Sequence, residues 1–407
     1  MSKFQLTFLT RLFFTGTVLT GLSIAFFTAS QAYSNRAPAT DPNMVGNNQK
    51  NNAAPIVSSA KPRIQLAILL DTSNSMDGLI NQTREQLWQM VDELSKAKRR
   101  NQTPALQVAV FEYGNDGLSA SVGHVRKVVG LTSELDRVSE ALFSLTTNGG
   151  QEYCGYAINT AVEQLEWSSN DEDLRLIFIA GNEPFTQGPI SYADAIQLAK
   201  QRDISVSTIF AGNYQEGQNT GWQQGAILAG GNFMSIDHNV QIAHIDAPQD
   251  ERIAVLNQRL NGTYLPFGQQ GKESALRQSA QDVASEEVSS AYLAKRAISK
   301  ASSLYNNSQW DLVDALAQGT VKLEELAAEQ LPEAMRDMPS NAQQQFIADK
   351  KAERLAIQNE IQRLSKARKE FVDEHRQQQT AKTPTFNDAI KTAISEQAKK
   401  KDYIFEQ

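Results

Sequence analysis

The stretch that decides the fold is residues 64–75, which read IQLAILLDTSNS. Its middle part, residues 66–70, is an unbroken apolar run, which is typical of a strand that is covered on both faces. Asp71, Ser73 and Ser75 follow at alternate positions directly after this run. One carboxylate and two hydroxyls around a single point are hard oxygen ligands of low total charge, which suit Mg²⁺ or Mn²⁺. The stretch therefore predicts a buried strand with a divalent-cation site at its carboxyl end.

The same three side chains have a second interpretation, as caps of the helix that is expected to begin near Gly78. Asp, Asn and Ser are favoured at helix N-termini because their side chains accept hydrogen bonds from free backbone N–H groups. This preference requires no metal, so the metal interpretation and the capping interpretation both stay open from the sequence.

Strand-like and helix-like segments alternate from residue 63 to about residue 240. The strands are expected at residues 64–70, 106–113, 122–129, 174–180, 204–211 and 232–236, and the helices at residues 80–97, 133–145, 192–202 and 222–228. The alternation predicts an α/β fold with a doubly wound, mostly parallel sheet and helices on both faces. The third strand follows a short connection with Gly and Asn, so we expect it to be an antiparallel edge. Ligands of such sheets bind beyond the carboxyl ends of the strands, where Asp71 and Glu183 lie.

The strand pattern stops after Gly268, and helical segments follow. These helices are expected at residues 273–304, 309–329, 341–378 and 386–405. One face of the third helix is apolar, while Lys, Arg and Glu fill the rest of its surface. We expect the helices either to pack as a solvated bundle on the α/β part or to form a coiled-coil-like surface for self-association or a partner.

The first 32 residues have the pattern of a secretory signal peptide. Lys3 and Arg11 precede the apolar segment 12–27, and residues 30–32 (Ser-Gln-Ala) offer a cleavage site. Residues 33–62 lack apolar periodicity and are expected to be a flexible linker. The pattern predicts cleavage after Ala32 and export to a bacterial periplasm or to the outside of the cell. The alternative is an uncleaved segment that anchors the protein in a membrane.

Residues 63 to about 240 resemble a von Willebrand factor type A domain. The motif Asp71-x-Ser73-x-Ser75 after a buried strand matches the first part of that family's metal-ion-dependent adhesion site, and the loop at residues 149–150 fits the family's order. The resemblance implies such a domain over residues 63–265, followed by an α-helical region over residues 266–407. It also implies binding of a divalent cation and a protein partner rather than catalysis.

Two positions of the site differ from the family's pattern. The pattern implies a Thr in the loop, where this chain has Glu152, and an Asp at the end of the fourth strand, where it has Gly181. Glu152 is longer than Thr and restores the charge that is missing at Gly181, and Glu183 lies two residues further along. The expected metal ligands are therefore Asp71, Ser73, Ser75, Glu152 and Glu183. The expected ion is Mg²⁺, with Mn²⁺ or Ca²⁺ as alternatives.

The charges of this site predict how strongly it attracts a negatively charged partner. Asp71 and Glu152 together balance the +2 charge of the ion. A neutralised ion attracts a partner's carboxylate less than a partly neutralised one, by a Coulomb energy of roughly a few kcal/mol at about 4 Å. We therefore expect the site to capture an acidic partner side chain more weakly than a standard site of the family.

The composition argues against other classes of protein. The net charge of −7 and the isoelectric point near 5.4 argue against a nucleic-acid-binding protein, which would normally be basic. Cys154 is the only cysteine, so the chain has no intramolecular disulfide, and this residue is expected to be a buried small side chain.

The function predicted from the sequence is that of an exported adhesion or scaffold module that binds a divalent cation and a protein, and that is not an enzyme. One alternative is an enzyme that uses Glu152, Glu183 and Cys154 in the same cleft. The other alternative is a structural envelope protein whose metal site does not function.

Overall fold

The structure, a computed structural model, describes residues 61–237, 245–377 and 386–405. The predicted signal peptide and all but two residues of the predicted linker lie outside these ranges. Within them, no helix is both long enough and apolar enough to cross a membrane.

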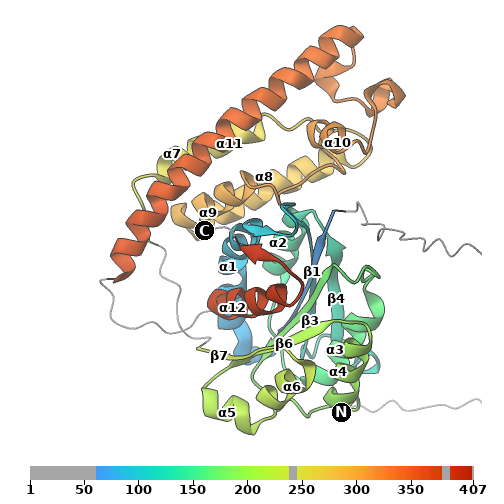
Figure 1. The fold of residues 1–407 in the computed structure, drawn as a ribbon, viewed down its shortest axis with the longest axis vertical. Helices are drawn as coiled ribbons and strands as arrows, with labels where there is room; N and C mark the ends of the chain where they lie inside the picture. The colour runs from blue at the N-terminus through green and yellow to red at the C-terminus, as the bar shows by residue number, and fades with distance from the viewer. Residues whose placement is uncertain (1–60, 238–244, 378–385, 406–407) are drawn as a thin grey trace, which may run out of the picture. The chain divides into compact units, whose positions relative to one another are not determined.

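A six-stranded sheet forms the centre of the α/β part (Figure 1). Its strands lie in the order β4-β3-β1-β5-β6-β7. They are β1 (Arg63–Asp71), β3 (Ala105–Tyr113), β4 (Val125–Thr132), β5 (Leu174–Gly181), β6 (Ser205–Ala211) and β7 (Phe233–Ile236). All neighbours pair in parallel except β3 and β4, which are antiparallel. The predicted mostly parallel sheet with an antiparallel edge strand is therefore confirmed.

Strand β1 lies at the centre of the sheet and is buried on both faces, as its apolar run predicts. Ile64, Leu66, Ile68 and Leu70 pack into one hydrophobic core, and the alternate residues Ala67 and Leu69 pack into a second. This alternation follows from the two-residue period of a strand, which sends successive side chains to opposite faces. The register pairs Asp71 with Tyr113 of β3, so the ends of these two strands lie side by side.

Helices cover both faces of the sheet. The first core includes residues of α1 (Asp77–Ser95) and α2 (Leu135–Ser144), and the second core includes residues of α3 (Cys154–Gln164), α4 (Tyr192–Gln201) and α6 (Trp222–Ala229). The short helix α5 (Tyr214–Asn219) packs on α6. Helix α3 was not predicted from the sequence, although its residues pack against the centre of the sheet.

The helical region contains α7 (Asp250–Asn261), α8 (Gly271–Val288), α9 (Ser290–Lys300), α10 (Leu312–Gln318) and α11 (Ser340–Gln377). The prediction of one helix at residues 273–304 is wrong, because Ser289 adopts an extended conformation and caps α9 by accepting a hydrogen bond from the backbone of Tyr292. The helix expected at residues 309–329 is confined to α10, which ends at Gly319 in the left-handed conformation. Helix α11 agrees with the prediction.

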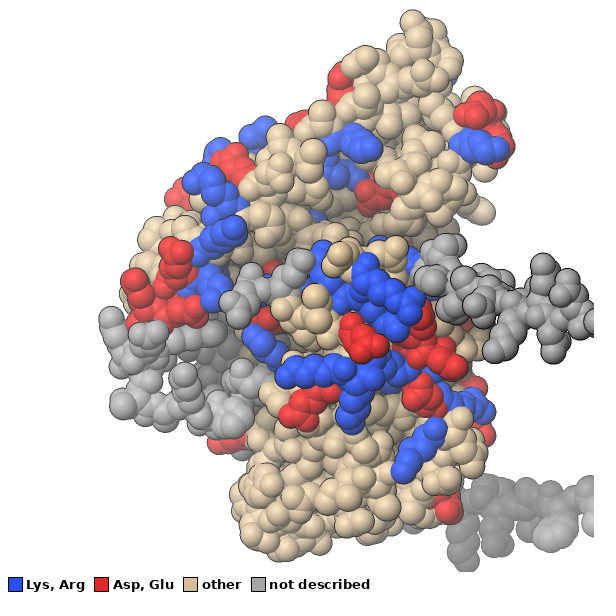
Figure 2. Space-filling model, in the orientation of Figure 1, with Lys and Arg blue, Asp and Glu red and all other residues tan. Residues whose placement is uncertain are grey.

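The last helix, α12 (Phe386–Lys399), returns to the α/β part. It packs on α1 and against β5, β6 and β7. The chain then forms β8 (Ile404–Phe405), which pairs with β2 (Ala97–Lys98). Figure 2 shows charged side chains gathered over this part of the surface, whereas the surface over α5 and α6 is mostly uncharged. Residues 59–407 form one compact unit, and the boundary expected at residue 265 stays a prediction.

Candidate metal centre

Three of the predicted ligands converge at the carboxyl edge of the sheet. The backbone N–H of Ser73 donates to Asp71 Oδ1 over 2.8 Å. A Cβ atom added to Gly114 would lie 2.9 Å from both Asp71 Oδ1 and Glu152 Cγ, so the side chains of Asp71 and Glu152 adjoin. A Cβ atom on Gly150 would likewise collide with the Glu152 carboxylate and lie 2.8 Å from Ser73 Cβ. Glycines at 114 and 150 thus leave the space in which these side chains meet.

Backbone hydrogen bonds fix the loops that carry these side chains. The N–H of Thr72 donates to the carbonyl of Tyr113 over 2.8 Å, and the N–H of Asn148 donates to the carbonyl of Thr72 over 3.0 Å. Asn74 and Gly149 are joined twice, because the N–H of Asn74 donates to the Gly149 carbonyl and Asn74 Oδ1 accepts from the Gly149 N–H, both over 3.0 Å. The loop after β1, the end of β3 and the loop before α3 are therefore held together.

The carboxyl group of Asp71 is buried without a complete set of partners. Its residue is 0% exposed, and Oδ2 accepts no hydrogen bond. The pKa of Asp71 is raised to about 7, chiefly by burial and also by the charges of Glu152 and Glu183, while hydrogen bonds from Ser73 oppose the change. A buried carboxylate in this state suits a cation ligand, because a nearby positive charge stabilises its ionised form.

Two further glutamates contribute charge to the same edge. Glu152 is 6% exposed, and burial raises its pKa, helped by the negative charges of Glu183 and Asp116. Glu183 is half-buried, and its Oε2 accepts a hydrogen bond from Gln187 Nε2 over 3.1 Å. The carbonyl of Glu183 accepts from the indole of Trp222 over 2.7 Å, which fixes this loop. Glu183 therefore acts on Asp71 through its charge, while Glu152 adjoins it.

In the tripod of Asp71, Ser73 and Ser75, Asp71 makes a hydrogen bond of the capping kind, because its Oδ1 accepts from the Ser73 N–H. Ser73 precedes the short 3₁₀ helix η1 (Asn74–Met76), and Met76 precedes α1. Neither of these N-cap residues makes a side-chain capping hydrogen bond. The backbone of Ser75 lies within η1, which begins shortly after Asp71 ends β1.

Tyr113 occupies the space that a side chain at position 181 would need, which accounts for the Gly at this position where the family pattern implies an Asp. A Cβ atom on Gly181 would lie 2.5 Å from Tyr113 Oη and 3.0 Å from Asp71 Oδ2. The phenol donates a hydrogen bond to the carbonyl of Ala180 over 3.0 Å, which holds it in this place. The sequence analysis missed Tyr113, although the parallel pairing of β1 with β3 would have placed it beside Asp71.

Cys154 lies near the site and is fully buried. It is 0% exposed, and its Sγ lies 3.7 Å from Tyr113 Oη. Burial raises the pKa of the Cys154 thiol far above neutral pH, so it forms no thiolate nucleophile. In the part of the chain that the structure describes, no group of three or more His, Cys, Asp and Glu residues has the arrangement of a metal site. The candidate centre therefore depends on a mixed set of carboxylate and hydroxyl oxygens.

An open hollow lies beside the two glutamates. It has a volume of about 650 Å³. Its lining consists of Ala120, Gln151, Tyr153, Gln187, Gly188 and Pro189. Gln151 precedes Glu152 in the chain, and Gln187 is the hydrogen-bond partner of Glu183. The hollow is therefore linked to the two glutamates through a chain neighbour and a hydrogen-bond partner, although none of the candidate ligands lines it.

One family model matches part of the α/β region. Residues 65–223 match the family model of the von Willebrand factor type A domain. No curated protein matches the chain. Among solved structures, BatB from Bacteroides thetaiotaomicron is 16% identical, with a TM-score of 0.33, over 47% of this chain and 95% of that chain. The von Willebrand factor type A domain of SpRpn10 is 16% identical, with a TM-score of 0.31, over 44% of this chain and 90% of that chain.

A third similar structure is proximal thread matrix protein 1 from the mussel byssus, in a form with a zinc-occupied metal-ion-dependent adhesion site motif. It is 14% identical, with a TM-score of 0.31, over 43% of this chain and 42% of that chain. This chain thus spans about two fifths of the length of that protein, 41% in another of its crystal forms. From the family match and the observed sheet, the chain contains a von Willebrand factor type A domain, which includes residues 65–223.

Proposed function

We propose that the carboxyl edge of the sheet binds a divalent cation through Asp71, Ser73 and Glu152, and that the cation and the surrounding loops bind a protein partner. The buried Oδ2 atom of Asp71, which has no hydrogen-bond partner, carries the proposal. The negative charges of Glu152 and Glu183 contribute to the raised pKa of Asp71, and a cation of charge +2 would relieve that repulsion. Domains of this family commonly bind a divalent metal and mediate protein interactions, which supports both parts of the proposal.

The donor set favours Mg²⁺, with Mn²⁺ and Ca²⁺ as alternatives. Carboxylate and hydroxyl oxygens are the ligands that these hard cations prefer, whereas structural zinc sites use mainly Cys and His. Ser75 is the further hydroxyl ligand that the tripod would supply, and Glu183 would add its charge. Because Asp71 and Glu152 neutralise the ion, we expect the site to bind a partner's carboxylate weakly and to rely on the loops around it.

We propose that the site binds rather than catalyses. The buried thiol of Cys154 has a raised pKa and lies against Tyr113, which disfavours its use as a nucleophile, while acid-base chemistry by Glu152 and Glu183 is the remaining form of the enzymatic alternative. The export of the protein, its periplasmic or secreted location and self-association through the helical region belong to the same proposal. They rest on the pattern of residues 1–32 and on the charged surface of α11.

The metal part of the proposal is tested by calorimetric titration of chelator-treated protein with Mg²⁺, Mn²⁺ and Ca²⁺. At pH 6.5 we expect binding to release protons, because the pKa of Asp71 is about 7 and a bound cation ionises this group. Titrations in two buffers of different ionisation enthalpy measure that release. Asp71→Asn should abolish binding and Glu152→Gln should weaken it, whereas Asp171→Asn, which changes an exposed carboxylate at the amino end of β5, should have little effect.

Binding that is absent, or unchanged in Asp71→Asn, would overturn the metal site. The partner part is tested separately, by comparing the proteins retained by wild type and by Asp71→Asn from an extract of the native cells. We expect Mg²⁺-dependent retention by wild type alone. Equal retention by both, with or without chelator, would favour the structural envelope protein instead.

A further inference from the structure

Helix α8 carries large apolar side chains on its exposed face. Leu276 is 63% exposed and Val283 is 56% exposed, although both are aliphatic. They are seven residues apart, close to two turns of an α-helix, so they lie on the same face. Ser279 and Ala280, which lie between them, are small and also exposed. Large apolar side chains that are exposed together on one face are typical of a surface where another protein binds.

The buried face of α8 is polar, which is the reverse of an ordinary surface helix. Gln281 accepts a hydrogen bond from Ser139 of α2 over 2.7 Å, and Gln278 donates one to Tyr305 over 3.0 Å. The buried residues of this helix are one glycine and four polar residues, Gly271, Ser274, Gln278, Gln281 and Ser285. Because hydrogen bonds hold the inward face, the apolar residues are left on the outward face, where a second molecule can cover them.

Opposite charges lie at the two ends of this outward face. Lys272 is one helical turn before the apolar residues, and Glu287 is one turn after them, so both share their face. Both side chains are exposed, and neither forms an ion pair within the described part of the chain. Glu273, which lies beside Lys272, is paired with Arg277 over 3.1 Å. We call residues 272, 276, 279, 280, 283 and 287 the α8 stripe, which is positive at one end and negative at the other.

We propose that the α8 stripe packs antiparallel against the α8 stripe of a second copy of this chain. Leu276 of each copy then lies against Val283 of the other, and Lys272 of each copy faces Glu287 of the other. A parallel pair would bring like charges together at both ends, so the charges select the antiparallel arrangement. The small residues in the middle of the stripe let the two helices approach each other closely. The same patch serves on both copies, as the two-fold symmetry of a dimer requires.

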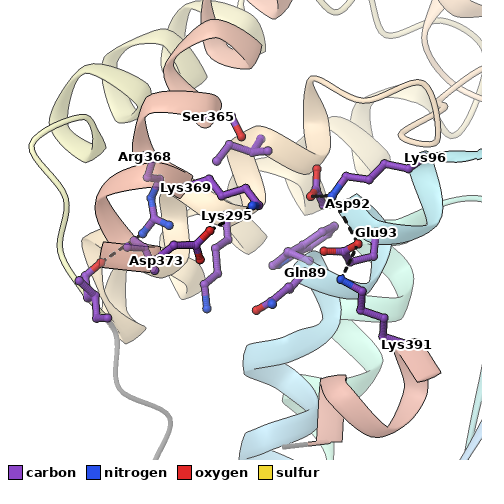
Figure 3. Close-up of a pocket in the computed structure, with 14 residues that line it drawn as sticks. Gln89, Asp92, Glu93, Lys96, Lys295, Ser365, Arg368, Lys369, Asp373 and Lys391 are labelled. Carbon is purple, nitrogen blue, oxygen red and sulfur yellow. Dashed lines mark hydrogen bonds and ion pairs between the residues drawn. The ribbon is translucent and has the colours of Figure 1, made fainter. Parts of the chain in front are cut away.

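Helix α11 also has a charged surface, but it is less suited to such pairing. Figure 3 shows Arg368, Lys369 and Asp373 on its second half. These charges have partners within the chain, because Arg368 pairs with Asp250 over 2.6 Å and Lys369 pairs with Asp373 over 3.0 Å. Leu355 is the one large apolar side chain that α11 exposes among its described residues. The pairing through α8 rests on the self-association part of the proposed function and is independent of the metal centre.

The interface is small, so the pairing is expected to be weak. Helix α8 has 18 residues and is therefore about 27 Å long. One pair of such helices buries less than the roughly 1,600 Å² that is typical of a stable complex, so we expect a dimer at about 0.1 mM protein and a monomer at about 1 µM. Sedimentation velocity of the full chain at these two concentrations measures the pairing.

Reversal of the charges at the two ends of the stripe tests the arrangement. Lys272→Glu places two glutamates together at both ends of the interface, and Glu287→Lys places two lysines together. Each variant alone should weaken the dimer at least about tenfold. An equimolar mixture of the two variants restores opposite charges at both ends, so it should dimerise as wild type does. A chain that carries both substitutions should also dimerise.

A second set of variants tests the apolar part of the stripe. Leu276→Gln should weaken the dimer about tenfold or more, because it removes one apolar contact from each copy. Leu355→Gln on α11 and Ile227→Gln on α6 are the matched controls, since these side chains are 58% and 64% exposed. Both controls should leave the dimer unchanged. All of these positions are exposed, so the fold should survive, and circular dichroism checks it.

The outcomes distinguish this pairing from self-association in general. A wild type that stays monomeric at the higher concentration would overturn both. A dimer that Lys272→Glu and Leu276→Gln leave intact would overturn the pairing through α8, and its loss in Leu355→Gln would assign self-association to α11 instead. A mixture of the charge variants that stays monomeric would overturn the antiparallel arrangement. Titration of Lys272→Glu with Mg²⁺ should match wild type, because α8 contributes no ligand to the metal centre.

Discussion

Two groups of carboxylates that are largely shielded from solvent show pKa shifts in opposite directions. At the carboxyl edge of the sheet, burial and the neighbouring glutamates raise the pKa of Asp71 to about 7. Between α2, α8 and α9, burial also acts on Asp282, but Lys300 and Arg296 outweigh it and hold the pKa of Asp282 well below its usual range. The difference lies in the cations that the protein supplies.

The second region, which we call the Arg296 network, is complete in itself. Arg296 is 0% exposed and bonds Asp136 of α2 over 2.7 Å and Asp282 of α8 over 2.5 Å. Lys300 lies 3.0 Å from Asp282, and Tyr305 donates to Asp136 over 2.5 Å. Burial lowers the pKa of Lys300 to about 8, so Arg296 is the permanent cation of the network. The network joins the helical region to the α/β part.

The comparison distinguishes buried carboxylates that stabilise the fold from those that are available for binding. Buried carboxylates that have their own cations stabilise an interface and need nothing from outside. Buried carboxylates that lack such cations destabilise the protein at neutral pH and gain from an external ion. This reasoning assigns the Arg296 network to folding and the Asp71 edge to binding.

The largest expected effect comes from removing the cation of the network. Arg296→Met leaves Asp136 and Asp282 buried with less compensation and removes the contact with Trp88. We expect the free energy of unfolding to fall by about 3–5 kcal/mol. Urea denaturation followed by circular dichroism measures this change.

The matched control is Arg252→Met, which removes an exposed ion pair in the same helical region. Arg252 pairs with Glu360 over 2.8 Å, and its side chain is 51% exposed. We expect a loss of no more than about 1 kcal/mol. Equal losses in the two arginine variants would contradict the assignment of the Arg296 network to stability.

The next largest effect concerns how stability depends on pH through Asp71. The pKa of Asp71 is about 7 in the folded protein and near 3.8 in the unfolded chain. Between pH 4 and pH 7, Asp71 is ionised in the unfolded chain but still protonated in the folded protein. The free energy of unfolding therefore falls as the pH rises over this range. Above pH 7 the full penalty remains, at most about 4 kcal/mol by the linkage relation.

Asp71→Asn removes this penalty, because an amide does not ionise. With chelator present, we expect the variant to match wild type at pH 4 and to exceed it in stability at pH 8. Asp171→Asn, which changes an exposed carboxylate at the amino end of β5, should keep the wild-type profile. A wild-type profile that is flat between pH 4 and pH 8 would show that Asp71 is compensated in the protein, and the comparison would fail.

The sequence was sufficient to predict the parts of this picture that depend on local patterns. The apolar run before Asp71 predicted a central strand with two buried faces, and the alternation of segments predicted the parallel sheet. These two features rest on residues close together in the chain or on the regular geometry of a parallel sheet. The proximity of Glu152 to Asp71 was implied only by the resemblance to the von Willebrand factor type A family.

The sequence did not predict the features that depend on distant pairs. Arg296 and Asp136 are 160 residues apart, and nothing in either segment indicates that they meet. The return of α12 to the sheet likewise depends on packing against α1, which periodicity alone does not reveal. Helix α3 was missed because its β-branched residues and Gly155 give it a weak helical propensity, which burial against the sheet overcomes.

The smallest expected effect concerns Gly181, where a further carboxylate can be added to the edge that already lacks cations. Gly181→Asp brings a side chain within 2.5 Å of Tyr113 Oη and beside Asp71, so we expect a loss of about 1–3 kcal/mol without metal. Gly130→Asp in β4 is the matched control, because a Cβ atom there meets nothing within 4 Å.

Adding Tyr113→Phe to Gly181→Asp removes the colliding oxygen, so the double variant should be more stable than the sum of the two single changes indicates. It should also gain more stability from Mg²⁺ than wild type does, because an additional carboxylate beside Asp71 raises the demand for a cation. Thermal unfolding with chelator and with excess Mg²⁺ measures both effects. If Mg²⁺ stabilises the double variant no more than wild type, the carboxylates at this edge do not act together on a bound ion, and the contrast with the Arg296 network would reduce to a difference in burial.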